Sequence, residues 1–532
     1  MKAGKQMGFN GGVYFGFVVI NILVSCVSAD AGNQVLCQWC ACVTDKSSWM
    51  PDKEPGLEGR PHKSDPNALL VNCSGLHASP FAGDYVWPDV PLQNIPDPNK
   101  SPDVPATRAD FSSSGLNGVM KNLPVKETRR LRELSLAHNQ ITTILPGSLT
   151  GLPALMLLDL SHNKLANLPQ DTLPLASDPS TASNLKVLLL SHNEFLKFPW
   201  EARLRLPMLE WLDVSSNFIK SLENGFNGKK EDLTFKTIEV LNLKHNRLTE
   251  LSSNAASRFP NLKVLDLSWN SILVVPDAFL AQSNSTFRNL SELNLDGNPI
   301  KRLGSNSFLG SPFLHLLSLS ASAELSEISS EAFDGLEDLR VLKLRKNILL
   351  SRLPAKGILR EVNETGGRRA LEEVDLSYNS LEYITPDFIP WKKINRVNLQ
   401  GNPWNCNCSL QWMLDKLMPR IYKTDSKLLM DLRCSKPRWL LGRRFVHWLG
   451  RSNGVYCGHK MEKLRMGLFP QEEVEDVDVV AMGMGPWTIA VIVSAATLVV
   501  GLIVLAIIWQ RRALRIEKEK RTRNYQCRNP RY

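Results

Sequence analysis

Histidines and aspartates recur along the middle of the chain at corresponding places of a repeated pattern. The histidines are His138, His162, His192 and His245, and the aspartates are Asp159, Asp213, Asp266 and Asp375. Imidazole nitrogens beside carboxylates could bind a transition metal, or the imidazoles could sense pH near 6 by taking up protons. The simpler alternative is that Ser-His-Asn is common usage at this place in the repeat, without a metal or a pH response.

Cysteines form two further groups with possible chemistry. The N-terminal group is Cys37, Cys40, Cys42 and Cys73, and the C-terminal group is Cys406, Cys408, Cys434 and Cys457. The spacing C-x2-C-x-C taken alone could indicate a metal site. In a secreted chain, however, an even set of cysteines indicates disulfides.

Sequence motifs of enzymes are absent. The chain has no H-E-x-x-H, G-x-S-x-G or G-x-x-x-x-G-K motif, and the cysteines are assigned to disulfides. We therefore expect neither catalysis nor a cofactor.

The two ends of the chain predict its place in the cell. Lys2 and Lys5 precede an apolar run and a small-residue site ending at Ala29, which is typical of a cleaved signal peptide. Residues 488–508 are uncharged and lie between Trp487 and Trp509, and at about 1.5 Å per residue they would span a bilayer. Arginines follow at once. The sequence therefore predicts a single-pass type I protein of the plasma membrane, with its N-terminus outside the cell.

The net charge of +10 is concentrated at these ends. Residues 511–532 carry nine Lys or Arg against two Glu, and Lys2 and Lys5 add two more positive charges. The remaining body therefore carries a net charge of only +1. A nearly neutral body offers no phosphate-tracking surface, so nucleic acid is not an expected partner.

An eleven-residue pattern, L-x-x-L-x-L-x-x-N-x-L, organises the rest of the chain. It recurs eleven times between Leu131 and Asn402, and a degenerate copy with Phe111 facing inward and Ser114 at the asparagine place precedes it from Ala106. Leucines two apart point to one face of a short strand, which can bury that face only if successive turns stack. The asparagine amide can satisfy backbone groups in the buried turn.

The repeat resembles the leucine-rich repeat family. This resemblance implies an α/β-class solenoid with a parallel sheet on its concave face, an irregular or 3-10 convex side, and disulfide-bonded caps. It also implies the cap pairings Cys37 with Cys42, Cys40 with Cys73, Cys406 with Cys434 and Cys408 with Cys457. The layout is similar to single-span leucine-rich repeat receptors and adhesion proteins, including trophoblast-glycoprotein-like modulators of growth-factor signalling.

Seven segments follow from these patterns. They are a signal peptide (1–29), an N-terminal cysteine-rich cap with a proline-rich loop (30–105), the repeats (106–402), a C-terminal cysteine-rich cap (403–458), an acidic stalk (459–486), a transmembrane helix (487–509) and a cytosolic tail (510–532). Longer repeats place insertions at about 169–184, 224–237, 277–289 and 352–370, which we expect to project as loops. N-glycosylation sequons stand at Asn72, Asn99, Asn284, Asn289 and Asn363.

The outward positions of the strands predict a surface for a protein ligand. The candidate residues are Trp211, His245, Trp269, Lys343, Arg345, Lys346 and Tyr378, which combine aromatic anchors with basic groups. The alternative for the basic set, which includes Arg340, is local pairing with Glu372, Glu373 and Asp375. A second basic set, in the C-terminal cap, consists of Arg438, Arg443, Arg444 and Arg451. It could contact glycosaminoglycan, although a solvated cap face is the simpler reading.

The expected function is recognition or adhesion at the cell surface, with any signal passed through a co-receptor. The rival is a trafficking receptor, because the chain ends in Asn529-Pro530-Arg531-Tyr532, which resembles the N-P-x-Y turn that endocytic adaptors bind. A cytosolic adaptor is thus a second possible partner.

Overall fold

The structure is a computed structural model, and it describes the chain in part. Backbone is described for residues 41–44, 69–72 and 278, and side chains as well for 108–120, 131–146, 148–149, 152–168, 172, 184–200, 206–223, 234–277, 279–280, 286–355 and 371–448. The chain divides into two compact units, Met1–Met461 and Glu462–Tyr532, and every described residue belongs to the first. The predicted signal peptide, stalk, membrane span and Asn529-Pro530-Arg531-Tyr532 motif lie outside these residues. Within the described part, no helix has the length and apolar character needed to cross a bilayer.

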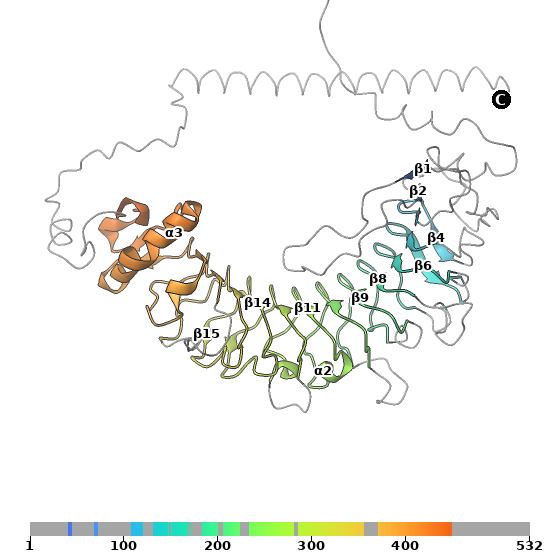
Figure 1. Ribbon diagram of the computed structural model, residues 1–532, viewed down its shortest axis with the longest axis horizontal. Helices are drawn as coiled ribbons and strands as arrows, with labels where there is room; N and C mark the ends of the chain where they lie inside the picture. Colours follow the sequence, from blue (N-terminus) through green and yellow to red (C-terminus); the bar gives the residue numbers. More distant parts are fainter. Residues whose placement is uncertain are drawn as a thin grey trace, which may run out of the picture. The chain divides into compact units, whose positions relative to one another are not determined.

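A fourteen-stranded sheet runs through the described turns (Figure 1). Its strands, in spatial order, are β1 (Ala41–Thr44), β2 (Leu69–Asn72), β3 (Arg108–Asp110), β5 (Glu133–Ser135), β7 (Leu157–Asp159), β8 (Val187–Leu189), β9 (Trp211–Asp213), β10 (Val240–Asn242), β11 (Val264–Asp266), β12 (Glu292–Asn294), β14 (Leu316–Ser318), β16 (Val341–Lys343), β17 (Glu373–Asp375) and β18 (Arg396–Asn398). Only β1 and β2 pair antiparallel. The solenoid with a parallel sheet is confirmed, and the strands lie on the inner side of the arc.

The degenerate first copy forms a turn of its own. Its strand β3 pairs with β5 in register, Phe111 is fully buried, and the Ser114 N–H donates to Asn139 of the next turn at 3.0 Å. The array of turns therefore begins before the recognisable repeat.

Buried asparagines fasten each turn to the one before it. Asn298 is 1 % exposed, and its amide nitrogen donates to the carbonyls of Leu267 at 2.9 Å and Leu295 at 3.0 Å. Its side-chain oxygen accepts from the Ile272 N–H at 3.1 Å. The strand ladder cannot reach these backbone groups, so the asparagine satisfies them inside the core. Turn 8, counted from the copy that begins at Leu131, carries Ser322 instead, and there the Ser322 N–H donates to Asn347 of the next turn.

The convex side is built from short helical turns and small sheets. They are α2 (Ala255–Arg258), the 3-10 helices η4 (Asp277–Phe279) and η5 (Trp391–Lys393), and the parallel pairs β4 (Asn117–Met120) with β6 (Gln140–Ile144) and β13 (Arg302–Leu303) with β15 (Glu327–Ile328). The expectation of an irregular or 3-10 convex side thus needs one correction, because α2 is an α-helical turn. Its two alanines, Ala255 and Ala256, are buried in the core.

The prediction that the insertions project from the stack is wrong at their ends. Phe235, Phe279 and Phe287 lie inside the predicted insertions, yet all three are at most 3 % exposed and belong to the main core. The Phe279 and Phe287 rings stack at 5.4 Å. Burying a phenylalanine side chain gains roughly 1.5–3 kcal/mol, which favours packing these three rings into the core.

The C-terminal cap closes the stack after β18. Its elements are β19 (Trp404–Asn405), the 3-10 helix η6 (Cys408–Leu410), a π-helical turn η7 (Met413–Leu417), α3 (Met418–Thr424), the 3-10 helix η8 (Ser426–Leu429), β20 (Cys434–Lys436) and the 3-10 helices η9 (Arg438–Leu440) and η10 (Phe445–Trp448). A disulfide joins Cys406 to Cys434. Cys408 is also disulfide-bonded, and Cys457, its predicted partner, lies outside the described residues. The side chains of Cys37, Cys40, Cys42 and Cys73 lie outside them as well.

Candidate functional site

A row of residues with left-handed backbone runs along the sheet, one residue before each repeat asparagine or, at Ala321, before Ser322. It consists of His138, His162, His192, Ser216, His245, Trp269, Gly297, Ala321, Lys346, Tyr378 and Gly401, all with φ between 52° and 68°. We call this row the turn ridge. Left-handed backbone costs a side-chain-bearing residue roughly 1–2 kcal/mol. The chain accepts that cost in nine turns because the sharp turn carries the following asparagine into the core. The sequence shows the row, but not its backbone conformation.

Three histidines of the turn ridge stack on one another. The ring centroids of His138 and His162 are 4.0 Å apart, as are those of His162 and His192, with interplanar angles of 15° and 11°. Burial, with the neighbouring His192 and His138, lowers the pKa of His162 to about 4. Burial and His138 also lower the pKa of His192. The hypothesis of a pH response near 6 is therefore wrong for His162, which stays uncharged well below that pH.

Replacement of His162 by glutamine is expected to weaken the dependence of stability on pH. Unfolded His162 takes up a proton near its ordinary pKa of 6.5, and folded His162 only near 4, so between these values the unfolded state binds more protons. The wild-type protein therefore loses stability as pH falls through this window. Melting temperatures of both proteins, measured from about pH 7 to about pH 4, should fall less in the variant. Equal falls would contradict the assignment.

Two aromatic side chains of the turn ridge rest on glycines of the following turns. The Trp269 ring lies between the His245 ring, at 5.6 Å, and Gly297, where a methyl group would overlap it. Tyr378 lies in the same way over Gly401, with the Arg345 guanidinium 5.1 Å from its ring centroid. Trp269 remains 49 % exposed and Tyr378 42 % exposed. Both rings are thus fixed in place while a large part of each faces solvent, which suits an interface anchor.

Trp211 adds a third aromatic group, on strand β9 of the concave face. It packs against Leu157, Val187 and Leu189, which form a small apolar cluster separate from the main core. Its indole nitrogen is buried and makes no hydrogen bond within the described residues.

The structure does not show the alternative in which the basic residues of the concave face pair with nearby carboxylates. Glu373 pairs with Arg396 at 3.6 Å, and Asp375 accepts from the Ser377 N–H at 2.9 Å and from Asn398. Among the described carboxylates, none forms an ion pair with Lys343, Arg345 or Lys346. Arg345 and Lys346 are exposed and Lys343 half-buried, so these cations remain available to a ligand.

The concave aspartates end strands instead of gathering into a metal site. Asp159 and Asp266 each accept the N–H two residues on, from Ser161 at 2.9 Å and Ser268 at 2.8 Å. Asn294 of the next turn donates to Asp266 at 3.2 Å. Burial raises the pKa of both carboxyl groups. Within the described ranges, no group of three His, Cys, Asp or Glu could hold a metal ion.

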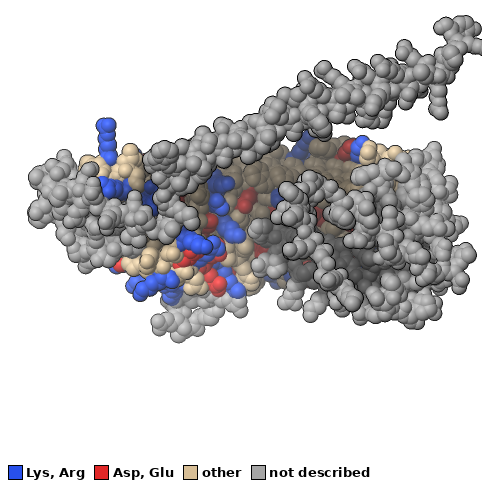
Figure 2. Space-filling model, turned by 90° about the horizontal axis from the view of Figure 1, so that it is seen from above, with Lys and Arg blue, Asp and Glu red and all other residues tan. Residues whose placement is uncertain are grey.

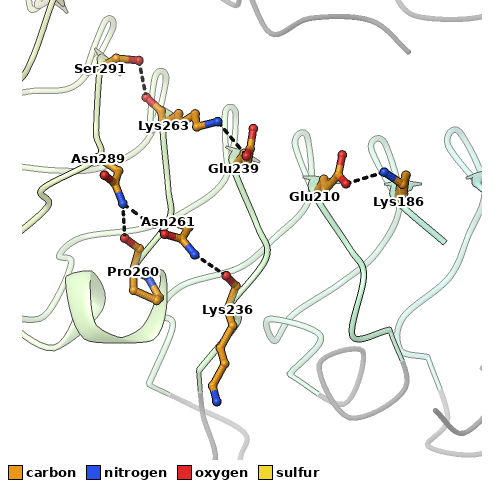
Figure 3. A network of polar contacts seen from close by, with 9 residues as sticks. All are labelled: Lys186, Glu210, Lys236, Glu239, Pro260, Asn261, Lys263, Asn289 and Ser291. Atoms are coloured by element: carbon orange, nitrogen blue, oxygen red, sulfur yellow. Dashed lines mark hydrogen bonds and ion pairs between the residues drawn. The ribbon is translucent and has the colours of Figure 1, made fainter. Parts of the chain in front are cut away.

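Polar contacts between turns also follow one flank of the array (Figure 3). There Asn289 donates to the Pro260 carbonyl at 3.0 Å and to Asn261 at 3.1 Å, and Asn261 donates to the Lys236 carbonyl at 2.7 Å. Asn289 is exposed, as a glycosylated residue must be, but both amide hydrogens are engaged, so a glycan would displace one contact. Asn72 lies in β2, and Asn99, Asn284 and Asn363 fall outside the described residues.

Known proteins share this repeat. A family model described as leucine rich repeat matches residues 126–173, 234–282 and 288–349. Tsukushi of Gallus gallus is 31 % identical over 289 residues, which cover 52 % of this chain and 72 % of Tsukushi. Tsukushi of Mus musculus is also 31 % identical, over 59 % of this chain and 71 % of its own. Chaoptin of Drosophila melanogaster is 30 % identical over 40 % of this chain and 17 % of its own.

Among solved structures, a chain of the mouse RP105/MD-1 complex matches 64 % of this chain and 58 % of its own length. The sequence identity is 22 % and the TM-score is 0.45.

Proposed function

This chain belongs to the leucine-rich repeat proteins of the extracellular type, and on that premise we propose that its concave face and turn ridge bind a protein ligand outside the cell. It is not an enzyme. The observation that carries the proposal is the pair of exposed rings, Trp269 and Tyr378, each held against a glycine. Rigid aromatic groups lose little side-chain entropy on binding, so they contribute strongly to affinity.

Charge on the same face adds specificity. Figure 2 shows lysines and arginines intermingled with acidic side chains on the face seen from above, mostly left of its centre. Arg345 and Lys346 lie beside Tyr378, whereas Trp211 packs against the buried apolar side chains of Leu157 and Val187. A ligand that fits this surface would place acidic groups near Arg345 and Lys346 and apolar groups near Trp211. Such matching fixes the register of a complex more than its affinity.

We further propose that the protein is a single-pass receptor or adhesion protein and that a co-receptor passes on any signal. The predicted membrane span and the arginines that follow it support this assignment. The rival, a trafficking receptor, is tested by Tyr532→Ala. Slower uptake of bound ligand in that variant would favour the rival, and unchanged uptake would remove it.

A ligand screen with matched tyrosine variants tests the binding surface. The fragment 30–485 is screened against an extracellular protein library, and each hit is measured with Tyr378→Ala, Trp269→Ala and Tyr383→Ala. Tyr383 is the control, since it is 42 % exposed, like Tyr378, but lies off the turn ridge. Loss of an anchor is expected to weaken binding roughly 30-fold or more, and the control should change it little. Equal losses at Tyr378 and Tyr383 would contradict the proposal.

A further inference from the structure

The C-terminal cap carries a cluster of positive charge in its last part. Residues 432–461 contain seven Lys or Arg and no Asp or Glu. Two of these cations have carboxylate partners, Arg433 with Asp431 at 3.1 Å and Lys436 with Glu382 at 2.7 Å. Arg438, Arg443 and Arg444 form no ion pair with any described residue.

Backbone contacts hold these arginines in one rigid loop. The Cys434 N–H donates to the Arg443 carbonyl at 2.9 Å, and the Gly442 N–H donates to the Cys434 carbonyl at 2.8 Å. Gly442 has a φ of 79°, a left-handed conformation that glycine adopts without strain, and it turns the chain back toward Cys434. Because Cys434 is bonded to Cys406, the loop is fastened to the start of the cap.

This loop places like charges opposite each other. Arg433 and Arg444 face one another across an isolated antiparallel bridge. Directly opposed like charges on paired strands are destabilising. Asp431 already compensates the charge of Arg433, whose guanidinium also donates to the Gly442 carbonyl at 3.4 Å, so Arg444 is the guanidinium without a described carboxylate partner at this bridge. A planar guanidinium matches the oxygens of phosphate or sulfate in pairs.

Exposed apolar side chains lie next to the arginines in the sequence of this loop. Trp439 is 45 % exposed and Leu441 is 66 % exposed, although Leu440 between them is buried. A site that bound its ligand by charge alone would need neither of these exposed side chains. A ligand that presents an apolar ring face as well as anionic groups would use both kinds of side chain.

We propose that Arg438, Trp439, Arg443 and Arg444 form a binding site for a sulfated glycosaminoglycan, separate from the protein-binding face. The extracellular setting of the leucine-rich repeat relatives favours this polyanion, because anionic lipids are concentrated in the cytosolic leaflet. Sugar rings can pack on the indole while sulfates pair with the guanidinium groups. The site would keep the protein near the cell surface or matrix, whichever protein ligand the concave face binds.

Heparin binding by the full-length chain in neutral detergent tests the proposal. The variant Arg438→Ala/Arg443→Ala/Arg444→Ala removes three charges whose side chains make no described ion pair, and the backbone bridge to Cys434 does not depend on them. The matched control Lys164→Ala/Lys197→Ala/Lys220→Ala also removes three charges, from exposed lysines of turns 2 to 4. Affinities are measured over a range of salt concentrations, since binding to a polyanion weakens as salt rises.

The arginine variant is expected to bind heparin at least about tenfold more weakly, and its slope of log affinity against log salt should fall by roughly one for each arginine removed. The lysine variant should match the wild-type protein. Three results would overturn the proposal: equal losses in both variants, equal binding of desulfated heparin, or binding to phosphatidylserine vesicles in preference to heparin. A separate Trp269→Ala variant should bind heparin normally, so failure of the protein-binding proposal would be seen independently.

Discussion

Replacement of Asn298 by alanine is expected to lower the free energy of unfolding by about 3–5 kcal/mol. The amide is 1 % exposed and bonds four backbone groups, at Leu267, Leu295, Asp296 and Ile272. Asn270 also donates to the Leu267 carbonyl, so that group keeps a partner. The Ile272 N–H and the Leu295 carbonyl would lose the side-chain contact inside the core, and each unsatisfied buried group costs about 1–3 kcal/mol.

Urea unfolding followed by circular dichroism measures this loss, and Asn261→Ala is the matched control. Asn261 makes the same kind of contact, to the Lys236 carbonyl at 2.7 Å, but it is exposed (Figure 3). Water can replace its hydrogen bond, so we expect a change of about 1 kcal/mol or less. If the two variants lost similar stability, burial would not explain why the repeated asparagines matter for stability.

The strands and the asparagine row could be predicted from the sequence because both follow a short period. A side chain at the first leucine place, such as Leu262, has only one face to occupy, and the pattern repeats often enough to fix the register. The same regularity located β3, whose copy lacks the asparagine. Local patterns thus determine the concave half of each turn.

The convex side and the ring contacts could not be predicted in this way. Phe235 and Phe287 lie in segments of variable length, and their burial depends on turns that are far apart in sequence, which no short period records. In the sequence, Gly297 and Gly401 are only positions without a side chain, yet the Trp269 ring lies on Gly297 and the Tyr378 ring lies on Gly401. Contacts between turns decide such positions, and a pattern within one turn carries no information about them.

Replacement of Trp200 by alanine is expected to lower the free energy of unfolding by about 3–5 kcal/mol. The indole is 1 % exposed and lies among Phe198, Phe235 and Phe259, with ring centroids 4.7 Å, 5.8 Å and 5.8 Å away. Its nitrogen donates to the Leu222 carbonyl at 2.9 Å. Alanine would leave a cavity that three rings on different turns cannot all move to fill.

Two comparison variants separate the contributions in the same unfolding measurement. Trp200→Phe keeps an aromatic ring but removes the hydrogen bond to Leu222, so we expect a smaller loss of about 1–3 kcal/mol. Trp439→Ala makes the same chemical change at a side chain that is 45 % exposed, and should cost about 0.5 kcal/mol or less. Phe235 reaches this cluster from the end of an insertion whose length varies from turn to turn. The Trp200→Ala loss could also be no larger than that of Trp439→Ala. In that case the aromatic cluster to which the insertion contributes Phe235 would add nothing to stability, and the leucine pattern alone would hold turns 3 to 5 together.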